Sequence, residues 1–297
     1  MSVAKVLKMI KDKEVKFVDL RFTDTKGKWQ HTAQTASTID ENTFKEGIMF
    51  DGSSIAGWKN INESDMILMP DPNTAVMDPF TAQPQMILFC DVIEPSDGKP
   101  YGLDPRSTGK KAEDYLKSSG IGEKCFFGPE AEFFIFDDVK WATNQEYTFF
   151  SIDSEEGAYN TGSEMEGGNM GHRPKDKGGY FPVPPVDSAT DIRAEMVSTM
   201  IEMGLDMEKH HHEVAPSQHE LGFKFGSLIE SADNLQKYKY CVHMVAQAYG
   251  KTATFMPKPV YNDNGSGMHV HQSIWSKSGS LFAGKEYAGL SDTCLHY

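Results

Sequence analysis

The pattern of apolar and polar positions predicts that the first hundred residues form a small mixed domain of several strands and little helix. Residues 2–14 carry apolar side chains at helical spacing, which predicts a short amphipathic helix. Lys16–Thr23 alternates with one buried face, and Trp29–Thr32 is expected to pair back with it as a hairpin. A helical turn is expected over Thr38–Phe44. Three further strands are expected, at Met66–Pro70, Ala75–Met77 and Gln85–Val92.

The pattern changes after a turn-rich segment at Pro95–Pro100. Asp104 is expected to cap a helix over residues 106–119, which ends at Gly120. We therefore place a domain boundary near residue 104. This gives two domains, over residues 1–104 and 105–297.

Two longer helices are expected in the second domain, at Ser188–Met203 and Ser231–Tyr249. The apolar residues expected on one face of the first are Ile192, Met196, Val197, Met200 and Ile201. Helices of this kind usually pack in the core, and we assign a catalytic role to neither.

Gly128–Phe136 predicts a buried strand, since a Gly-Pro pair marks its start and aromatic and branched residues fill its C-terminal half. Alternate residues of a strand point to the same face, so Glu130 and Glu132 project together. Two carboxylates on an apolar strand are unfavourable unless something positive lies between them. A half-exposed strand with two solvated acids is an equally good interpretation of this stretch alone.

Two downstream clusters add acids and imidazoles. Glu213 and Glu220 follow a run of histidines and could approach each other across a hairpin, although a histidine run is a weak indication of metal binding. His269 and His271 are two apart on a predicted strand and so share a face. The preceding Asn264–Gly267 is a glycine-rich loop whose backbone can come close to a ligand. Two ordinary histidines in a polar strand would look the same.

Two loops have features of a binding site. Phe50–Trp58 could present Asp51 to a polar ligand, or be a surface loop whose Trp58 packs back on the domain. Ser151–Pro185 is long, polar and glycine-rich, and the aromatic side chains within it favour an ordered loop.

Composition excludes several classes of protein. With 43 acidic and 29 basic residues and a net charge of −14, the chain lacks the basic face of a general nucleic-acid or anionic-membrane binder. No apolar run reaches the roughly 18 residues of a membrane span. The N-terminus has no signal-peptide pattern. The four cysteines have neither metal nor disulfide spacing, which suits a reducing cytoplasm.

The candidate residues favour a magnesium or manganese site. Glutamate oxygens with at most one imidazole suit Mg²⁺ or Mn²⁺ and disfavour structural zinc. Divalent ions held by glutamates are what phosphoryl transfer from a nucleotide requires. The chain has no Walker A motif, no kinase glycine loop and no dinucleotide-binding fingerprint. The residues alone therefore indicate a Mg²⁺- or Mn²⁺-dependent enzyme, either a phosphotransferase or a hydrolase.

Six motifs, in order along the whole chain, resemble those of bacterial type I glutamine synthetase. They are Phe50–Ser54, Gly128–Phe133, Lys177–Pro182, His211–Ala215, Lys251–Pro259 and Asn264–His269. The passage with Glu156–Tyr159 and Glu166–Asn169 resembles the I-β subclass, whose members are often controlled by adenylylation. The resemblance implies an α+β protein. An N-terminal β-grasp-like domain would precede a catalytic domain built on a curved antiparallel sheet, incomplete at its C-terminus.

The resemblance implies an ATP-dependent ligase that joins ammonia to L-glutamate through γ-glutamyl phosphate, for nitrogen assimilation. By resemblance, one divalent ion is held by Glu132, Glu213 and Glu220. Glu130 and His269 would hold the other, which bridges the ATP phosphates.

The remaining roles also come from the resemblance. His271 matches a phosphate contact, Glu208 and Ser273 match nucleotide contacts, and Asn264 with Gly265 matches the loop that holds glutamate. Asp51 matches the acid that binds and deprotonates ammonium. In this family, that acid is delivered by a neighbouring subunit, typically within a dodecamer of two hexameric rings.

The chain departs from the family in two places. The loop between Glu213 and Glu220 is one residue shorter than in some members, and family members continue beyond the position of Tyr297. The sixth metal ligand, the phosphate-binding arginines, the flap acid and the adenylylated tyrosine are expected in that continuation. The 297 residues alone are expected to be inactive and to fold poorly, since a sheet cut midway leaves open edges.

Two alternative functions remain at this stage. One is an inactive fragment or structural homologue, although clustered acids are of no use to a scaffold. The other is a γ-glutamyl ligase that uses an amine other than ammonia, although the presence of Asp51 favours ammonia as the substrate.

Overall fold

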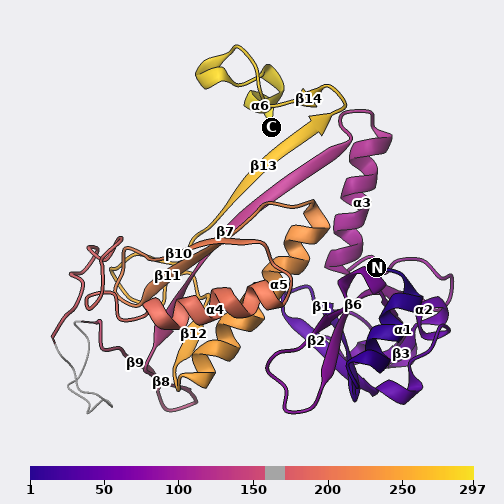
Figure 1. Cartoon of the computed structure of the whole chain (residues 1–297), viewed down its shortest axis with the longest axis horizontal. Coiled ribbons are helices and arrows are strands. Elements are labelled where there is room, and N and C mark those ends of the chain that lie inside the picture. The colour runs from indigo at the N-terminus through magenta and orange to yellow at the C-terminus, as the bar shows by residue number, and fades with distance from the viewer. Residues whose placement is uncertain (158–170) are drawn as a thin grey trace. The chain divides into compact units, whose positions relative to one another are not determined.

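The computed structural model describes residues 1–157 and 171–297 (Figure 1). The chain forms two compact units. The first comprises Met1–Phe126, Gly226–Asp233 and Ser273–Tyr297, and the second comprises Phe127–Phe225 and Asn234–Gln272. Part of the passage Ser151–Pro185, including the Glu166–Asn169 motif, lies outside the described residues.

The first unit is a mixed sheet with helices. Its elements are α1 (Val3–Asp12), β1 (Phe17–Thr23), β2 (Trp29–Thr35), α2 (Thr43–Glu46), β3 (Ile48–Asp51), β4 (Asp65–Pro70), β5 (Val76–Met77), β6 (Gln85–Ile93), α3 (Pro105–Ser118), β14 (Gly279–Ser280) and α6 (Asp292–His296). The strand order is β2-β1-β6-β4-β3, with β5 also paired to β6. The antiparallel β1–β2 hairpin and strands β4, β5 and β6 confirm the strands expected from the sequence, whereas β3 was not expected. The expectation of one buried face for β1 was wrong, because residues 18–22 are all buried and Arg21 pairs with Asp19 on the second face.

The apolar stripe of α1 covers one face of this sheet. Val6 and Ile10 are buried against Leu20 and Leu88, which alternate inward along β1 and β6. Trp58 belongs to the same core and is 7% exposed. The side chain therefore packs back on the domain, which was one of the two interpretations of the Phe50–Trp58 loop.

The helical turn expected over Thr38–Phe44 was misplaced. One short 3₁₀ turn covers Ala36–Thr38, and α2 begins only at Thr43. The carboxylate of Asp40 accepts the backbone N–H groups of Asn42 and Thr43 at 2.8 and 3.1 Å. Such a local side-chain bond offers the backbone an alternative to helix, which separates the two turns.

Asp104 caps α3 as the sequence indicated. Its carboxylate accepts the N–H groups of Arg106 and Ser107, both at 3.1 Å, and that of Val92 in β6 at 3.2 Å. One fully buried side chain therefore closes the helix and holds it to the sheet.

The second unit has a sheet that is mainly antiparallel. The elements not yet given are β7 (Lys124–Phe136), β8 (Asp138–Thr143), β9 (Thr148–Asp153), α4 (Thr190–Glu202), β10 (Met207–His212), β11 (Gln218–Phe223), α5 (Leu228–Ala248), β12 (Thr252–Thr254) and β13 (Met268–Ser276). Several of these, including β7, α5 and β13, have residues in both units. The strand order is β10-β11-β7-β13-β14, with β12 also paired to β7 and β8 paired to β9 as a hairpin.

Two expectations for this unit were wrong in detail. β7 begins at Lys124, so the Gly-Pro pair lies inside the strand and not at its start. Proline is tolerated there because β11 and β12 pair with β7 only at residues 132–136, so neither of these pairings needs an N–H from Pro129. On α4, Ile201 is 55% exposed while Arg193 is buried. Both guanidinium Nη atoms of Arg193 bond the Asp187 carboxylate, and this pairing compensates for the desolvation of the buried charge. The spacing of apolar residues cannot predict the burial of such a charged side chain.

The cap of α3 gives the first prediction. Replacing Asp104 with Ala should lower the free energy of unfolding by about 1–2 kcal/mol, because two helix N–H groups lose their acceptor. Asp104→Asn keeps an acceptor oxygen and should cost less. Urea denaturation of the full-length protein measures both, and equal losses in the two variants would contradict a capping role.

Candidate functional site

Strand register in the second unit places acidic side chains together. Glu132 on β7 lies opposite Glu220 on β11, and Glu220 in turn lies opposite His211 on β10. Glu213 follows directly after β10, at the turn of the β10–β11 hairpin. The predicted approach of Glu213 to Glu220 across a hairpin thus occurs, and β7 adds Glu132 beside them.

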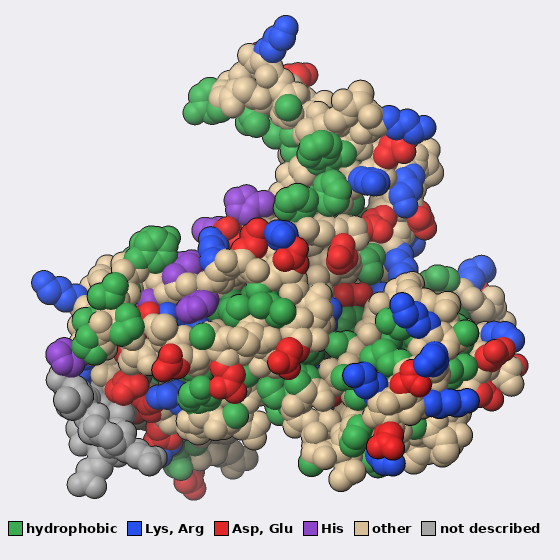
Figure 2. All heavy atoms as spheres, viewed as in Figure 1, with side chains coloured by type: hydrophobic (Ala, Val, Ile, Leu, Met, Phe, Trp, Pro, Cys, Tyr) green, Lys and Arg blue, Asp and Glu red, His purple; other side chains and the backbone are tan. Residues whose placement is uncertain are grey.

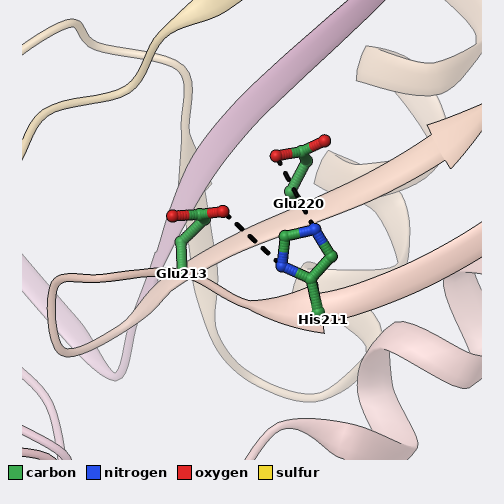
Figure 3. A group of neighbouring side chains, drawn as sticks. All are labelled: His211, Glu213 and Glu220. Atoms are coloured by element: carbon green, nitrogen blue, oxygen red, sulfur yellow. Dashed lines mark ion pairs between the residues drawn. The ribbon is translucent and has the colours of Figure 1, made fainter. Parts of the chain in front are cut away.

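His211 lies between the two hairpin carboxylates. Its Nδ1 is 3.5 Å from Glu213 and its Nε2 is 3.7 Å from Glu220 (Figure 3). Among the described residues, these three side chains offer ligand atoms that all lie within 4.8 Å of one another. Burial lowers the pKa of His211, which favours the neutral imidazole that can act as a donor to a metal.

A second carboxylate–histidine group is formed by β7 and β13. Glu130 lies 3.7 Å from Nδ1 of His269 and 3.2 Å from Nε2 of His271. The two imidazoles therefore share one face of β13, as their spacing predicted, and both are mostly exposed. Histidine and acidic side chains are visible next to one another over the strands of the second unit in Figure 2.

The carboxylates raise one another's affinity for protons. Burial, followed by the charges of Glu132 and Glu220, raises the pKa of Glu213 to about 7. Burial and the charges of Glu130 and Glu132 raise the pKa of Glu220. In the described part of the chain, no lysine or arginine forms an ion pair with these four glutamates.

This donor set fits a divalent cation. It consists of buried carboxylate oxygens of Glu213 and Glu220 with the imidazole of His211 beside them, and thiolates are absent from it. Hard oxygen ligands of this kind are those of Mg²⁺ and Mn²⁺. A cation would relieve the repulsion that raises the pKa values of Glu213 and Glu220.

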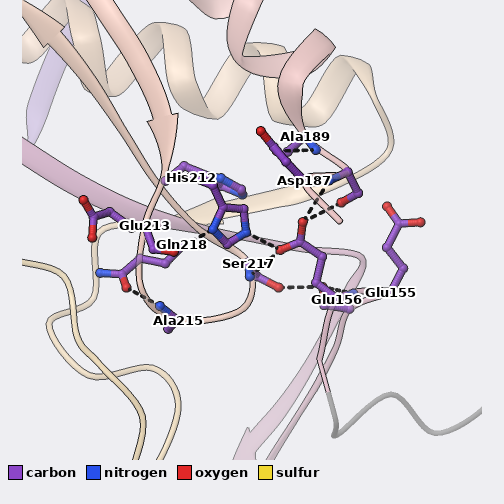
Figure 4. Close-up of polar contacts among 12 residues, drawn as sticks. Glu155, Glu156, Asp187, Ala189, His212, Glu213, Ala215, Ser217 and Gln218 are labelled. Atoms are coloured by element: carbon purple, nitrogen blue, oxygen red, sulfur yellow. Dashed lines mark hydrogen bonds and ion pairs between the residues drawn. The ribbon is translucent and has the colours of Figure 1, made fainter. Parts of the chain in front are cut away.

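A buried polar network supports the hairpin turn (Figure 4). The carboxylate of Glu156, 2% exposed, accepts His212 Nε2 at 2.7 Å, Ser217 N–H at 2.7 Å, and the N–H and hydroxyl of Ser188 at 3.1 and 2.7 Å. The hydrogen bonds and charge of His212 overcome the desolvation and lower the pKa of Glu156 to about 2. His212 therefore faces away from the acidic cluster and anchors the strand that carries Glu213.

The glycine-rich loop contacts this cluster as well. The carboxylate of Glu132 accepts the N–H of Gly267 at 3.1 Å and the side-chain amide of Gln218 at 2.6 Å. The same amide donates to the carbonyl of Gly265 at 2.9 Å. Asn264 precedes these residues, and its N–H bonds the Asp263 carboxylate at 2.8 Å.

Each of the three remaining predicted residues belongs to a strand. Glu208 is an exposed residue of β10 in the second unit. Ser273 and Asp51 belong to the first unit, where the Ser273 hydroxyl accepts the Trp275 indole N–H at 3.0 Å. Asp51 ends β3, and bonds from Ser53 and Ser54 lower the pKa of its carboxyl.

Sequence reasoning missed His211, Gln218 and Glu156. His211 could have been found from strand alternation, since it is two residues before Glu213 and Glu213 was already expected at a site. Gln218 and Glu156 gave no such signal, because their contacts are to residues far away in the sequence.

Comparison with known protein families gives two matches. Residues 102–297 match the family described as "Glutamine synthetase, catalytic domain", and residues 14–95 match "Glutamine synthetase, beta-Grasp domain". The observed architecture is thus a β-grasp domain followed by part of a glutamine synthetase catalytic domain, as expected. The boundary near residue 104 stays a prediction.

Individual relatives agree with the family matches. The chain is 63% identical to glutamine synthetase of Bradyrhizobium diazoefficiens, over 100% of this chain and 64% of the relative. It is 62% identical to that of Azospirillum brasilense, over 100% of this chain and 63% of the relative. Among solved structures, Plasmodium falciparum glutamine synthetase matches with a TM-score of 0.91 and 28% identity, over 100% of this chain and 58% of that chain.

The chain spans a little under two thirds of the length of these curated relatives. Among its described residues, no helix is both long enough and apolar enough to span a membrane.

The raised pKa of Glu213 gives the second prediction. In the metal-free protein, the pKa of Glu213 is about 7 in the folded state, against an ordinary pKa of 4.5. The folded state therefore binds this proton more tightly, and its contribution to stability falls as pH rises from about 4.5 to about 7. Glu213→Gln should therefore flatten the fall in thermal midpoint between pH 5 and pH 8, measured in EDTA.

The exposed Glu202, at the end of α4, provides the matched control. Glu202→Gln should leave the pH dependence of the thermal midpoint as in the unmodified protein. A Glu213→Gln protein with an unchanged pH dependence would contradict the repulsion among these carboxylates.

Proposed function

Because the chain belongs to the glutamine synthetase family, we propose that the full-length protein joins ammonia to L-glutamate with conversion of ATP to ADP and phosphate. The observation that carries this proposal is the group of facing carboxylates on β7 and the β10–β11 hairpin, with which no lysine or arginine of the described residues forms an ion pair. Such a group is suited to holding divalent cations beside an anionic nucleotide.

We assign the cation ligands in two sets. Glu132, Glu213 and Glu220 would hold one Mg²⁺ or Mn²⁺ ion, and Glu130 with His269 would hold the other. Bound ions of this kind neutralise charge on the transferring phosphoryl group and on the carboxylate that attacks it. The strand pairing of Glu132 with Glu220 supports the first set, and the 3.7 Å separation of Glu130 from His269 supports the second.

Five further residues are assigned to the substrates. Asn264 and Gly265 would hold glutamate, and the hydroxyl of the neighbouring Ser266 is buried without a hydrogen-bond partner among the described residues. His271 would contact a phosphate of ATP, while Glu208 and Ser273 would contact the nucleotide.

The proposed reaction has two balanced steps. A γ-carboxylate oxygen of glutamate attacks the γ-phosphorus of ATP and ADP leaves, which gives γ-glutamyl phosphate. Ammonia then attacks the acyl carbon, and phosphate leaves to give glutamine. The Asp51 carboxylate would bind ammonium and take its proton; serine hydrogen bonds that lower its pKa keep this carboxyl ionised at neutral pH.

Asp51 is proposed to act in the active site of a neighbouring subunit, within a dodecamer of two hexameric rings. We also infer a cytoplasmic location, which suits the four free cysteines of the chain. No nucleic-acid partner is proposed for a chain whose net charge is −14.

The third prediction tests the reaction itself. The full-length protein should release ADP only when glutamate, ammonium and Mg²⁺ or Mn²⁺ are present together. Glu130→Gln should lower kcat/KM by about a hundredfold or more, because it removes a charged cation ligand, while the exposed Glu202→Gln should not. ADP release that needs methylamine or a polyamine instead of ammonium would replace this proposal with that of another γ-glutamyl ligase.

The fourth prediction concerns ammonium. Asp51→Asn cannot accept a proton and should lower kcat/KM for ammonium by about a hundredfold or more. The KM for ATP should stay close to its original value. Asp97→Asn, in an exposed turn, is the matched control, and equal losses in the two variants would remove Asp51 from the proton transfer.

A further inference from the structure

Gln218 is a buried side chain whose contacts join the acidic cluster to the glycine-rich loop. It is 1% exposed and begins β11, directly after the hairpin turn that carries Glu213. Its Nε2 donates to Glu132 Oε2 at 2.6 Å and to the Gly265 carbonyl at 2.9 Å. Its Oε1 accepts the Ala215 N–H at 3.0 Å (Figure 4). Both amide hydrogens and one carbonyl lone pair are thus used.

The backbone of Gln218 holds the same turn. Its carbonyl accepts the Glu213 N–H at 2.7 Å, and its N–H donates to Ala215 at 3.1 Å. Glu220 lies two residues further along β11 and therefore on the same face of the strand. Gln218 therefore bonds the Glu132 carboxylate through its side chain and the Glu213 N–H through its backbone, and it shares a strand face with Glu220.

The acceptor on the loop lies where the loop backbone packs closely. A Cβ at Gly265 would lie 2.2 Å from the Pro257 carbonyl oxygen, so the loop backbone packs tightly there. Gly267 N–H bonds the same Glu132 oxygen that Gln218 contacts. The Glu132 carboxylate and the loop are therefore held together at two points.

The chemistry of an amide suits this position. A lysine there would form an ion pair with Glu132 and compete with a cation for its oxygens. A glutamate would add a fifth negative charge and could not donate to the Gly265 carbonyl. Glutamine fixes one oxygen of Glu132 without changing the net charge of the cluster.

We propose that Gln218 is a positioning residue that ties Glu132 to the Gly265 carbonyl, and so couples cation binding to the binding of glutamate. This inference rests on the proposed function, because it takes Glu132 as a cation ligand and the Gly265 loop as the glutamate site. Partners that orient metal ligands typically change metal affinity or activity by about 10–100-fold when removed.

The test compares two variants of the full-length protein. Gln218→Met has a similar length and removes all three side-chain hydrogen bonds. It should raise the dissociation constant for Mn²⁺, measured by calorimetry without substrate, by about tenfold or more. It should also raise the KM for glutamate while the KM for ATP changes little. Gln247→Met, at an exposed position of α5, should change none of these values.

Gln218→Glu covers the case in which the Met variant fails to fold. Its carboxylate can still accept the Ala215 N–H but repels Glu132 and the Gly265 carbonyl, so the KM for glutamate should rise. Folded variants with the original Mn²⁺ dissociation constant and glutamate KM would overturn the inference. An unmodified protein that binds Mn²⁺ but shows no glutamate-dependent ADP release would instead overturn the proposed function, and the Mn²⁺ comparison would still decide whether Gln218 orients Glu132.

Discussion

Mutual repulsion among the glutamates at residues 130, 132, 213 and 220 is the constraint on which the rest of the site depends. Antiparallel pairing of β7 with β11 brings two of them face to face, and the hairpin turn adds the third. Burial and neighbouring charge raise the pKa of Glu213 to about 7, which is the electrostatic cost of this arrangement without a cation. A divalent ion would convert the same repulsion into affinity.

The structure resists this repulsion by means of buried neutral and paired groups. Glu156 fixes His212 and Ser217 at the two ends of the hairpin turn, and Gln218 fixes Glu132 from the other side. None of these contacts places a lysine or arginine within the cluster. The carboxylates are therefore held in position while their negative charge stays available to a cation. Metal centres typically divide these roles between residues that bind the metal and residues that orient them.

Much of the fold could be predicted from the sequence, because alternation and capping are local signals. The β1–β2 hairpin, the Asp104 cap and the shared face of Glu130 and Glu132 all follow from residues close together in the chain. The same reasoning failed for Ile201, which is exposed, and for Arg193, which is buried with the Asp187 carboxylate as its partner. Tertiary contacts override periodicity where a charged residue finds a buried partner.

The acidic candidates could also be named from the sequence, although their roles came from family resemblance rather than from spacing. Strand alternation predicted that His269 and His271 share a face, and both lie beside Glu130. The same alternation places His211 on the face of Glu213, and His211 lies between Glu213 and Glu220. Gln218 could not be found in this way, because it contacts Glu132, 86 residues away in the sequence, and Gly265, 47 residues away.

The most direct test of the central claim is the anomalous scattering of Mn²⁺ in crystals of the full-length protein. The account predicts one peak between the carboxylates of Glu132, Glu213 and Glu220, and a second beside Glu130 and His269. Peaks at other residues, or no peak at saturating Mn²⁺, would contradict the assignment of these carboxylates as a cation site.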